Sequence, residues 1–298
     1  MKRFALTCFA LFMLSGAGGF IAYQTAPTLP PPLLSLQYLS LPKGIANGVV
    51  FLLSDETGWG AREATISARL RADGIAVVGV DTPSYLTKIS EVKDSCAYLI
   101  ADVERISQQI QRDSGSSGYI APVVAGIGLG GGLALDMVDQ TPDATVGGTA
   151  VADPVSSVPF GVELCTPAGY FSTAKGQIYT LPKAPLVDPI TVSLSSDVAS
   201  DIRQRAESLN KGSADVTLIR DTPATADTVT SMIRARLAFA QRAKDTLPVT
   251  VLRAVPKHDT MAIILSGDGG WRDIDASIAK MMQADGVPVV GLDSLRYF

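Results

Sequence analysis

A glycine-rich turn at residues 126–132, GIGLGGG, has the spacing of a turn that holds a catalytic nucleophile. It follows an apolar run that is typical of a buried strand. In the pattern G-x-S-x-G, the outer glycines give the serine room on a tight strand-to-helix turn, from which its hydroxyl attacks a carbonyl. Gly126 and Gly130 occupy the glycine positions, but Gly128 occupies the serine position. We therefore predict a degenerate nucleophile elbow without a hydroxyl.

The acid and the base of a Ser–His–Asp triad are also incomplete in this sequence. The chain has one histidine, His258, in a segment that we interpret as a linker, and we expect it to be a linker contact or solvated. Asp197 follows an apolar run at the place where the triad acid would lie. Without a histidine to orient, we expect Asp197 to cap the helix that begins at Ser200.

The same turn allows two other readings. Gly126, Gly128 and Gly131 match G-x-G-x-x-G, and Asp153 follows about 20 to 25 residues later, where an acid could bind a ribose. This motif would come third in its sheet rather than first, so a nucleotide site is the weaker hypothesis. Alternatively, the glycines only allow close packing of a helix on a strand. We expect no cofactor, and no Cys and His cluster indicates a metal site.

A second glycine-bearing loop, LSGDGGWRDID at residues 265–275, could present backbone N–H groups to a negative oxygen. Such a loop supplies part of an oxyanion hole in enzymes with the elbow above. The oxyanion candidates are Gly267, Asp268, Gly269 and Gly270, and Asp268 and Asp293 are candidates for shaping a pocket. The matching loop at residues 55–59, DETGW, carries two carboxylates that would repel an oxyanion. Trp59 and Trp271 are expected to pack against the sheet.

These two loops belong to an internal repeat. Residues 50–86 and 262–298 align without a gap at an offset of 212 residues, and 14 of 37 positions are identical. Each copy has an apolar run, a loop, a helical pattern ended by glycine, and a second apolar run. The repeat therefore predicts two copies of one strand–loop–helix–strand unit.

Alternating strands and helices predict an α/β fold with a mostly parallel, doubly wound sheet, similar to the α/β-hydrolases, and an incomplete second copy at the C-terminus. Strands are predicted at 49–53, 75–80, 119–126, 146–153, 189–197, 214–221, 262–265 and 287–292, and helices at 61–73, 91–112, 131–140, 200–210, 224–244 and 274–285. The predicted domains are a degenerate hydrolase-like domain at 48–245, a linker at 246–260 and a truncated second domain at 261–298.

The N-terminus has the layout of an export signal. Two basic residues precede an apolar run and then small residues, so 1–25 is predicted to be a signal peptide or a membrane anchor, followed by a Pro-rich tether at 26–47. The protein is then expected in a periplasm, where Cys96 and Cys165 either form a disulfide or remain buried thiols. The net charge of −4, without a basic block, argues against nucleic acid as a partner.

The segments LSGDGGWRDID and GVPVVGLDSLRYF, together with the export signal, resemble the VirJ/AcvB family of bacterial virulence proteins. The resemblance implies a periplasmic serine hydrolase that removes the amino acid from lysyl-phosphatidylglycerol, with a link to type IV secretion. It implies that aminoacylated phospholipid or secretion-system proteins are partners. Because the nucleophile and base are missing, we expect the chain to be inactive as an esterase. The alternative functions are a non-catalytic module that binds lipid or a partner protein and, less favoured, a nucleotide-binding protein.

Overall fold

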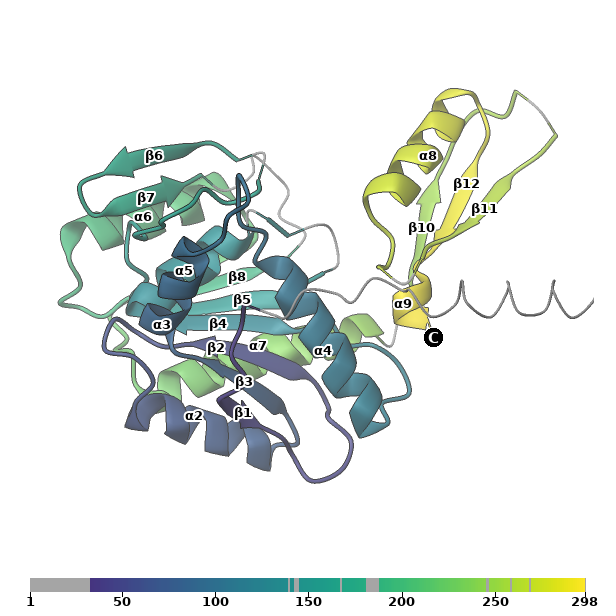
Figure 1. Ribbon diagram of the computed structural model, residues 1–298. Helices are drawn as coiled ribbons and strands as arrows, with labels where there is room; N and C mark the ends of the chain where they lie inside the picture. Colours follow the sequence, from purple (N-terminus) through teal and green to yellow (C-terminus); the bar gives the residue numbers. More distant parts are fainter. Residues whose placement is uncertain are drawn as a thin grey trace, which may run out of the picture. The chain divides into compact units, whose positions relative to one another are not determined.

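A seven-stranded sheet with the order β1-β3-β2-β4-β5-β8-β9 forms the centre of the larger part of the fold (Figure 1). The computed structural model describes residues 33–138, 140–141, 145–166, 168–180, 188–244, 247–257, 259–267 and 269–297. The strands of this sheet are β1 (Tyr38–Ser40), β2 (Val49–Leu53), β3 (Ala76–Val80), β4 (Val123–Ile127), β5 (Gly148–Ala152), β8 (Ile190–Ser193) and β9 (Val216–Ile219). All neighbours pair in parallel except β1, which runs antiparallel to β3.

Helices cover both faces of this sheet. One face packs against α3 (Thr82–Ser90), α4 (Ile100–Ser114), α5 (Gly128–Val138) and α6 (Ser200–Gly212). The other face packs against α2 (Ala61–Ala72) and α7 (Ala226–Lys244). Strands β2, β3, β4 and β5 are buried along their whole length, which explains why their sequences are continuous apolar runs rather than alternating ones.

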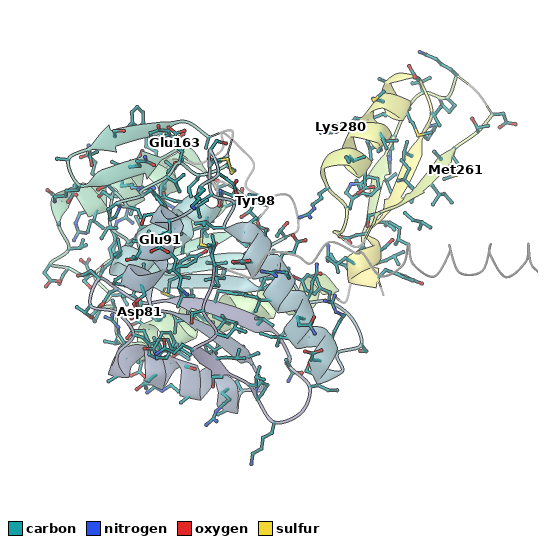
Figure 2. All side chains as sticks on the ribbon, viewed as in Figure 1. Asp81, Glu91, Tyr98, Glu163, Met261 and Lys280 are labelled. Carbon is teal, nitrogen blue, oxygen red and sulfur yellow. A yellow bond between two sulfur atoms is a disulfide. The ribbon has the colours of Figure 1, made fainter. Side chains whose placement is uncertain are left out.

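An insertion between β5 and β8 carries a two-stranded hairpin, β6 (Tyr170–Thr173) and β7 (Gly176–Tyr179). A disulfide between Cys96 and Cys165 ties the segment ahead of this hairpin to the loop before α4. Figure 2 shows the disulfide near the labelled residues Glu163 and Tyr98. Of the two states that the sequence left open for these cysteines, the structure has the disulfide.

A separate three-stranded sheet contains the second copy of the repeat. It comprises β10 (Val249–Leu252), β11 (Ala262–Leu265) and β12 (Val289–Leu292), with α8 (Asp273–Ala284) between β11 and β12 and a short α9 (Ser294–Tyr297) at the end. The strand register repeats with the offset of 212 residues: Phe51 pairs with Val78 in the first copy, and Ile263 pairs with Val290 in the second. The internal repeat is therefore a repeat of structure.

The repeat extends further upstream than the sequence alignment indicated. Tyr38 of β1 pairs antiparallel with Gly79, and Thr250 of β10 pairs antiparallel with Gly291, again at the same offset. The interpretation of 246–260 as a plain linker was therefore wrong at residues 249–252. These strands are only three and four residues long, so each is too short to give a clear periodic pattern in the sequence.

The predicted helix at 91–112 was also wrong in its first half. Residues 91–99 form a loop, α4 begins at Ile100, and a separate helix, α3, occupies residues 82–90. Asp81 caps α3 by accepting the N–H of Ser84 at 3.1 Å, and Pro83 lies in its first turn. The disulfide at Cys96 and a backbone pairing of Ala97 with Leu164 hold the loop in its extended form.

The remaining predicted elements are found with ends shifted by a few residues, and the hairpin β6–β7 and strand β1 were not predicted. The predicted strand at 119–126 begins only at Val123, because Pro122 lacks the N–H that a strand would donate. Within the described part of the chain, no helix is long and apolar enough to span a membrane. The predicted signal or anchor at 1–25 and residues 26–32 of the predicted tether lie outside the described residues. The prediction that the tether extends to residue 47 was wrong, because β1 at Tyr38–Ser40 lies within it and pairs with β3 of the main sheet.

Candidate functional site

The degenerate elbow lies at the point where the strand order reverses. The chain passes from β2 to β3 on one side of β2 and later returns to β4 on its other side. Loops leaving the carboxyl ends of β2 and β4 therefore diverge, and such a point is the usual place for a ligand in an open α/β sheet. The loop after β2 contains Asp55, and the elbow after β4 contains Gly128. The candidate site lies between these two loops.

Gly128 has a left-handed backbone with φ of +53°, at the junction between β4 and α5. The two flanking glycines are required by close backbone contacts. A Cβ at position 126 would lie 2.2 Å from the carbonyl oxygen of Gly130, and a Cβ at position 130 would lie 2.3 Å from that of Ser54. The elbow thus keeps the tight turn of a nucleophile site while its central residue has no side chain.

A carboxylate lies where a nucleophile side chain would begin. A Cβ at position 128 would be 2.8 Å from Oε2 of Glu56 and 3.1 Å from Cβ of Asp55. Asp55 forms an ion pair with Arg62 and accepts the N–H of Thr57 at 2.8 Å. Although burial raises the pKa of Asp55, the hydrogen bonds from Thr57 and the ion pair hold it below its ordinary value. The first-copy loop is therefore negative at the elbow, which is unfavourable for an oxyanion.

The positions of the triad acid and base hold no catalytic pair. Helix α6 has Ala199 as its N-cap and makes no side-chain cap hydrogen bond, so the prediction that Asp197 caps this helix was wrong. Asp153 instead accepts two hydrogen bonds from Ser195, from its N–H at 2.7 Å and from its hydroxyl at 2.6 Å. After β9, where a base would lie, the chain has Arg220, Asp221 and Thr222. His258 lies outside the described residues.

The bonds of Asp153 also weigh against the nucleotide hypothesis, because both carboxylate oxygens are already engaged by Ser195. The other glycines of the turn have a packing reason. A Cβ at Gly131 would lie 3.1 Å from Pro154, and one at Gly132 would lie 2.6 Å from the Val155 side chain. These glycines let α5 approach the chain that follows β5. Among the described residues, no group of His, Cys, Asp and Glu side chains could hold a metal ion.

The second-copy loop has more open glycines than the first. Gly267 is exposed, and a Cβ there would meet nothing within 4 Å. Gly270 has a φ of +78° and donates its N–H to the Gly267 carbonyl at 3.2 Å. A Cβ at Gly269 would lie 2.9 Å from the Arg272 guanidinium. Asp268, the fourth oxyanion candidate, lies outside the described residues.

Asp293 has a structural role that its first-copy equivalent shares. It accepts the N–H of Arg296 at 3.2 Å, as Asp81 accepts that of Ser84. A Cβ at Gly270 would lie 3.2 Å from Asp293, and a Cβ at Gly58 would lie 2.6 Å from Asp81. Hydrogen bonds from Ser84 and Trp59 hold the pKa of Asp81 below its ordinary value. Both aspartates thus fix a loop and the start of a helix, and Asp81 is labelled in Figure 2.

The two tryptophans lie on glycines of the second strand in each copy. A Cβ at Gly79 would lie 2.3 Å from the Trp59 ring, and a Cβ at Gly291 would lie 2.2 Å from the Trp271 ring. Trp59 also stacks on Tyr38, with the ring centroids 4.9 Å apart. The expectation that the tryptophans pack against the sheet is therefore confirmed.

A buried ion pair between Asp136 and Arg205 was not found by sequence reasoning. Asp136 lies on α5 and is fully buried, and its Oδ1 is 3.0 Å from an Nη of Arg205 on α6. Burial raises the pKa of Asp136 to about 7, although the Arg205 charge opposes this shift. The two residues are 69 positions apart and belong to no recognised motif, so no local signal in the sequence pairs them.

The strand order, the helices on both faces and the elbow after β4 define an α/β-hydrolase-like protein. Residues 259–298 match the family of bacterial virulence proteins called VirJ, which confirms the resemblance over that segment. No curated protein sequence matches the chain.

Solved structures of esterases and lipases resemble the chain at low sequence identity. Est1E from Butyrivibrio proteoclasticus is 11% identical, with a TM-score of 0.43 over 67% of this chain and 93% of that one. A putative carboxylesterase from Lactobacillus plantarum is 13% identical, with a TM-score of 0.42 over 67% and 86%. A soluble variant of monoglyceride lipase from Saccharomyces cerevisiae is 10% identical, with a TM-score of 0.42 over 73% and 97%.

Proposed function

We propose that the seven-stranded domain is a non-catalytic member of the α/β-hydrolase fold that binds an aminoacylated phospholipid at the elbow. The observation that carries the proposal is the replacement of the nucleophile by Gly128, with the Glu56 carboxylate directly against that position. Ester hydrolysis of this type needs a hydroxyl nucleophile and a base that takes its proton. The elbow has neither group, so it can hold an ester without cleaving it.

The charge at the elbow suits a cationic head group. Glu56 is exposed, and no hydrogen bond or ion pair of its carboxylate is found among the described residues. Lysyl-phosphatidylglycerol, the substrate that the VirJ resemblance implies, carries two ammonium groups on its lysyl head. A free carboxylate next to an empty elbow would attract such a head group, whereas an oxyanion hole would favour a negative one.

We further propose that the protein acts outside the cytosol, close to a membrane. The disulfide between Cys96 and Cys165 supports this location, because disulfides persist in oxidising compartments such as the periplasm. The charged and apolar N-terminal sequence supports export by a signal peptide or an anchor. A secretion-system protein, as the family's link to type IV secretion implies, is the alternative partner of the same surface.

The three-stranded sheet is proposed to be the first unit of a second hydrolase-like domain. In the first copy Phe51 and Leu53 are fully buried under α4 and α5. Their equivalents, Ile263 and Leu265, are 69% and 63% exposed. Because equivalent positions of the repeat are buried in the first copy and exposed in the second, we infer that the second unit needs further elements to cover its apolar residues. Figure 2 labels another exposed apolar residue of this unit, Met261.

Vesicles with and without lysyl-phosphatidylglycerol test the proposed function. We expect the purified chain to bind the lysylated vesicles more tightly than phosphatidylglycerol vesicles and to release no lysine above the buffer rate. Release of lysine, or labelling of the chain by a serine-reactive phosphonate, would show that the domain is catalytic. Equal binding to the two kinds of vesicle would show that the chain does not recognise the lysyl group, and it would refute the proposed function.

Glu56→Gln separates the proposed site from general membrane binding. It removes one charge and keeps the shape, so we expect several-fold weaker binding to the lysylated vesicles and unchanged binding to the others. Glu91→Gln is the matched control, because Glu91 is also an exposed glutamate but lies at the far end of α3. If both variants bind alike, Glu56 does not recognise the head group.

A further inference from the structure

A groove of about 980 Å³ lies between the β6–β7 hairpin and α6, and it shares no lining residue with the elbow. Figure 1 shows the hairpin and α6 side by side. The groove has an apolar wall formed by Phe171, Ile178 and Leu209. Its volume lies at the upper end of the range of small-molecule sites, roughly 300 to 1,000 Å³. The groove is therefore large enough for a ligand with a sizeable apolar body.

Arg205 lines this groove and connects three parts of the chain. Its guanidinium donates to the Ser156 carbonyl, to the Tyr179 carbonyl at 3.3 Å and to Asp136 at 3.0 Å. Tyr179 is held in turn by the Leu164 N–H, which donates to its hydroxyl at 2.8 Å, next to the disulfide. This network places the groove on a rigid base, and rigid elements make precise binding sites.

The groove has hydrogen-bond donors that are not fully used. Ser156 is 9% exposed and lines the groove, and its Oγ is buried without a hydrogen-bond partner among the described residues. Native proteins rarely leave a buried hydroxyl unpaired, so an unpaired one in a cavity points to a ligand. Lys175, exposed at the turn of the hairpin, adds an ammonium group at the rim. One carboxylate, Asp201, also lines the groove.

The chemistry of the groove selects one kind of ligand. Phe171 is part of the apolar wall and is 65% exposed, although a large aromatic ring is normally covered. Ser156 and Lys175 offer an O–H and an ammonium group to a head group that accepts hydrogen bonds. We propose that this groove binds an anionic amphiphile, with its hydrocarbon body against Phe171, Ile178 and Leu209 and a carboxylate or phosphate head near Ser156 and Lys175. This proposal does not depend on the function proposed for the elbow.

Titration of the full chain with 11-(dansylamino)undecanoic acid tests the proposal, because the dansyl fluorescence rises when this fatty-acid probe enters an apolar site. We expect saturable binding with one site per chain. Fluorescence that rises linearly without saturation would overturn the proposal, since it would report only loose adsorption. The methyl ester of the probe tests the head group: we expect it to bind about tenfold more weakly, and equal affinity would refute an anion-selective site.

Three variants locate the probe in the groove. Phe171→Ser and Lys175→Glu change exposed side chains, so both should fold, and each should weaken probe binding about tenfold. Ser156→Ala removes a hydroxyl that has no internal partner, so it should weaken binding without lowering stability. If all three variants bind the probe like the original chain, the site lies elsewhere and the proposal fails.

Two matched controls change the same residue types outside the groove. Phe239→Ser alters an exposed phenylalanine on α7, and Lys43→Glu alters an exposed lysine in the loop before β2. Both should leave probe binding unchanged; a loss equal to that of the groove variants would indicate a nonspecific effect of charge or hydrophobicity and overturn the assignment.

Competition distinguishes the two sources of such a head group. Displacement of the probe by dodecanoate alone would identify a free carboxylic acid as the ligand, and displacement by soluble dihexanoyl phosphatidylglycerol alone would identify a phospholipid. Both results support the proposal and name the source. Displacement by neither compound, at concentrations that saturate known fatty-acid sites, would overturn it.

Discussion

Breaking the disulfide between Cys96 and Cys165 should remove a large part of the stability of the seven-stranded domain. The bond closes a loop with a sequence separation of 69 residues. In the chain-entropy description, a closed loop of this length restricts the unfolded chain by about 15 cal/mol/K, which is about 4 kcal/mol at 25 °C. Typical domains have only about 5 to 15 kcal/mol of stability, so the expected loss is a large fraction of the total.

The folded state should keep its local geometry without the bond. Hydrogen bonds hold the same two segments together: the Ala97 N–H donates to the Glu163 carbonyl at 2.8 Å, and the Cys165 N–H donates to the Ala97 carbonyl at 3.0 Å. Gln140 adds a bond from its amide to the Ala97 carbonyl at 2.6 Å. The loss should therefore arise mainly from the unfolded state, and the slope of the unfolding transition should reflect a more expanded unfolded chain.

Urea unfolding followed by far-UV circular dichroism measures this loss. The oxidised chain is compared with the Cys96→Ala/Cys165→Ala variant and with the chain in reducing agent; the last two should agree. Reducing agent added to the double variant is the control and should change nothing. A difference below about 1 kcal/mol between the oxidised chain and the double variant would refute the loop-closure reasoning, since it would mean that the unfolded chain is already restricted.

Three further predictions test the packing and the buried charges. Gly79→Ala should lower the free energy of unfolding by about 1 to 3 kcal/mol, because its Cβ would lie 2.3 Å from Trp59. Gly212→Ala is the control and should not lower the free energy of unfolding, because its Cβ would meet nothing within 4 Å. Equal effects of the two substitutions would exclude the Trp59 contact as the cause. Phe51→Ala should lower the free energy of unfolding by about 3 to 5 kcal/mol, whereas Ile263→Ala, at the equivalent position of the second copy, should lower it by less than about 1 kcal/mol, because only Phe51 is buried. Urea unfolding measures both losses. Similar losses would mean that the three-stranded sheet is covered in solution. Asp136 holds its proton more tightly in the folded state than in the unfolded chain, with a pKa raised from 3.8 to about 7. Its contribution to stability should therefore be favourable at low pH and fall as pH rises from about 4 to 7, by at most about 4 kcal/mol. Asp136→Asn should flatten that part of the pH profile of stability, and an unchanged slope would contradict the raised pKa.

The long apolar runs and the glycine positions could be predicted from the sequence because their causes are local. A strand buried on both faces, such as β2, must be apolar at every residue. Gly74 and Gly286 end their helices in left-handed backbone, with φ of +82° and +79°. The repeat could be predicted for the same reason, since equal local sequences adopt equal local structures, down to the strand register.

The edge strand β10, the hairpin β6–β7 and the loop before α4 depend on contacts made far along the chain, so they escaped prediction. Residues 91–99 have a helical pattern but are held extended by Cys165 and Leu164 from the insertion. The start of α6 was mispredicted for the same reason. Asp197 does not cap the helix, and the nearby Ser195 donates its N–H to Asp153, which lies far away in the sequence. At each of these places, contacts with distant parts of the chain outweigh the local conformational preference of the residues.

The sequence by itself determined that the elbow has no nucleophile, because a missing hydroxyl at Gly128 is a matter of residue type. Only the tertiary structure decided what replaces it, since Glu56 and Gly128 follow two neighbouring strands whose paired residues, such as Val50 and Val123, are 73 positions apart in the chain. The pair of Asp136 and Arg205, and the groove above it, likewise exist only once α5, α6 and the hairpin pack together. Residue types set which chemistry is possible, and packing sets which groups meet, because charge and hydrogen bonding act through space over a few ångströms.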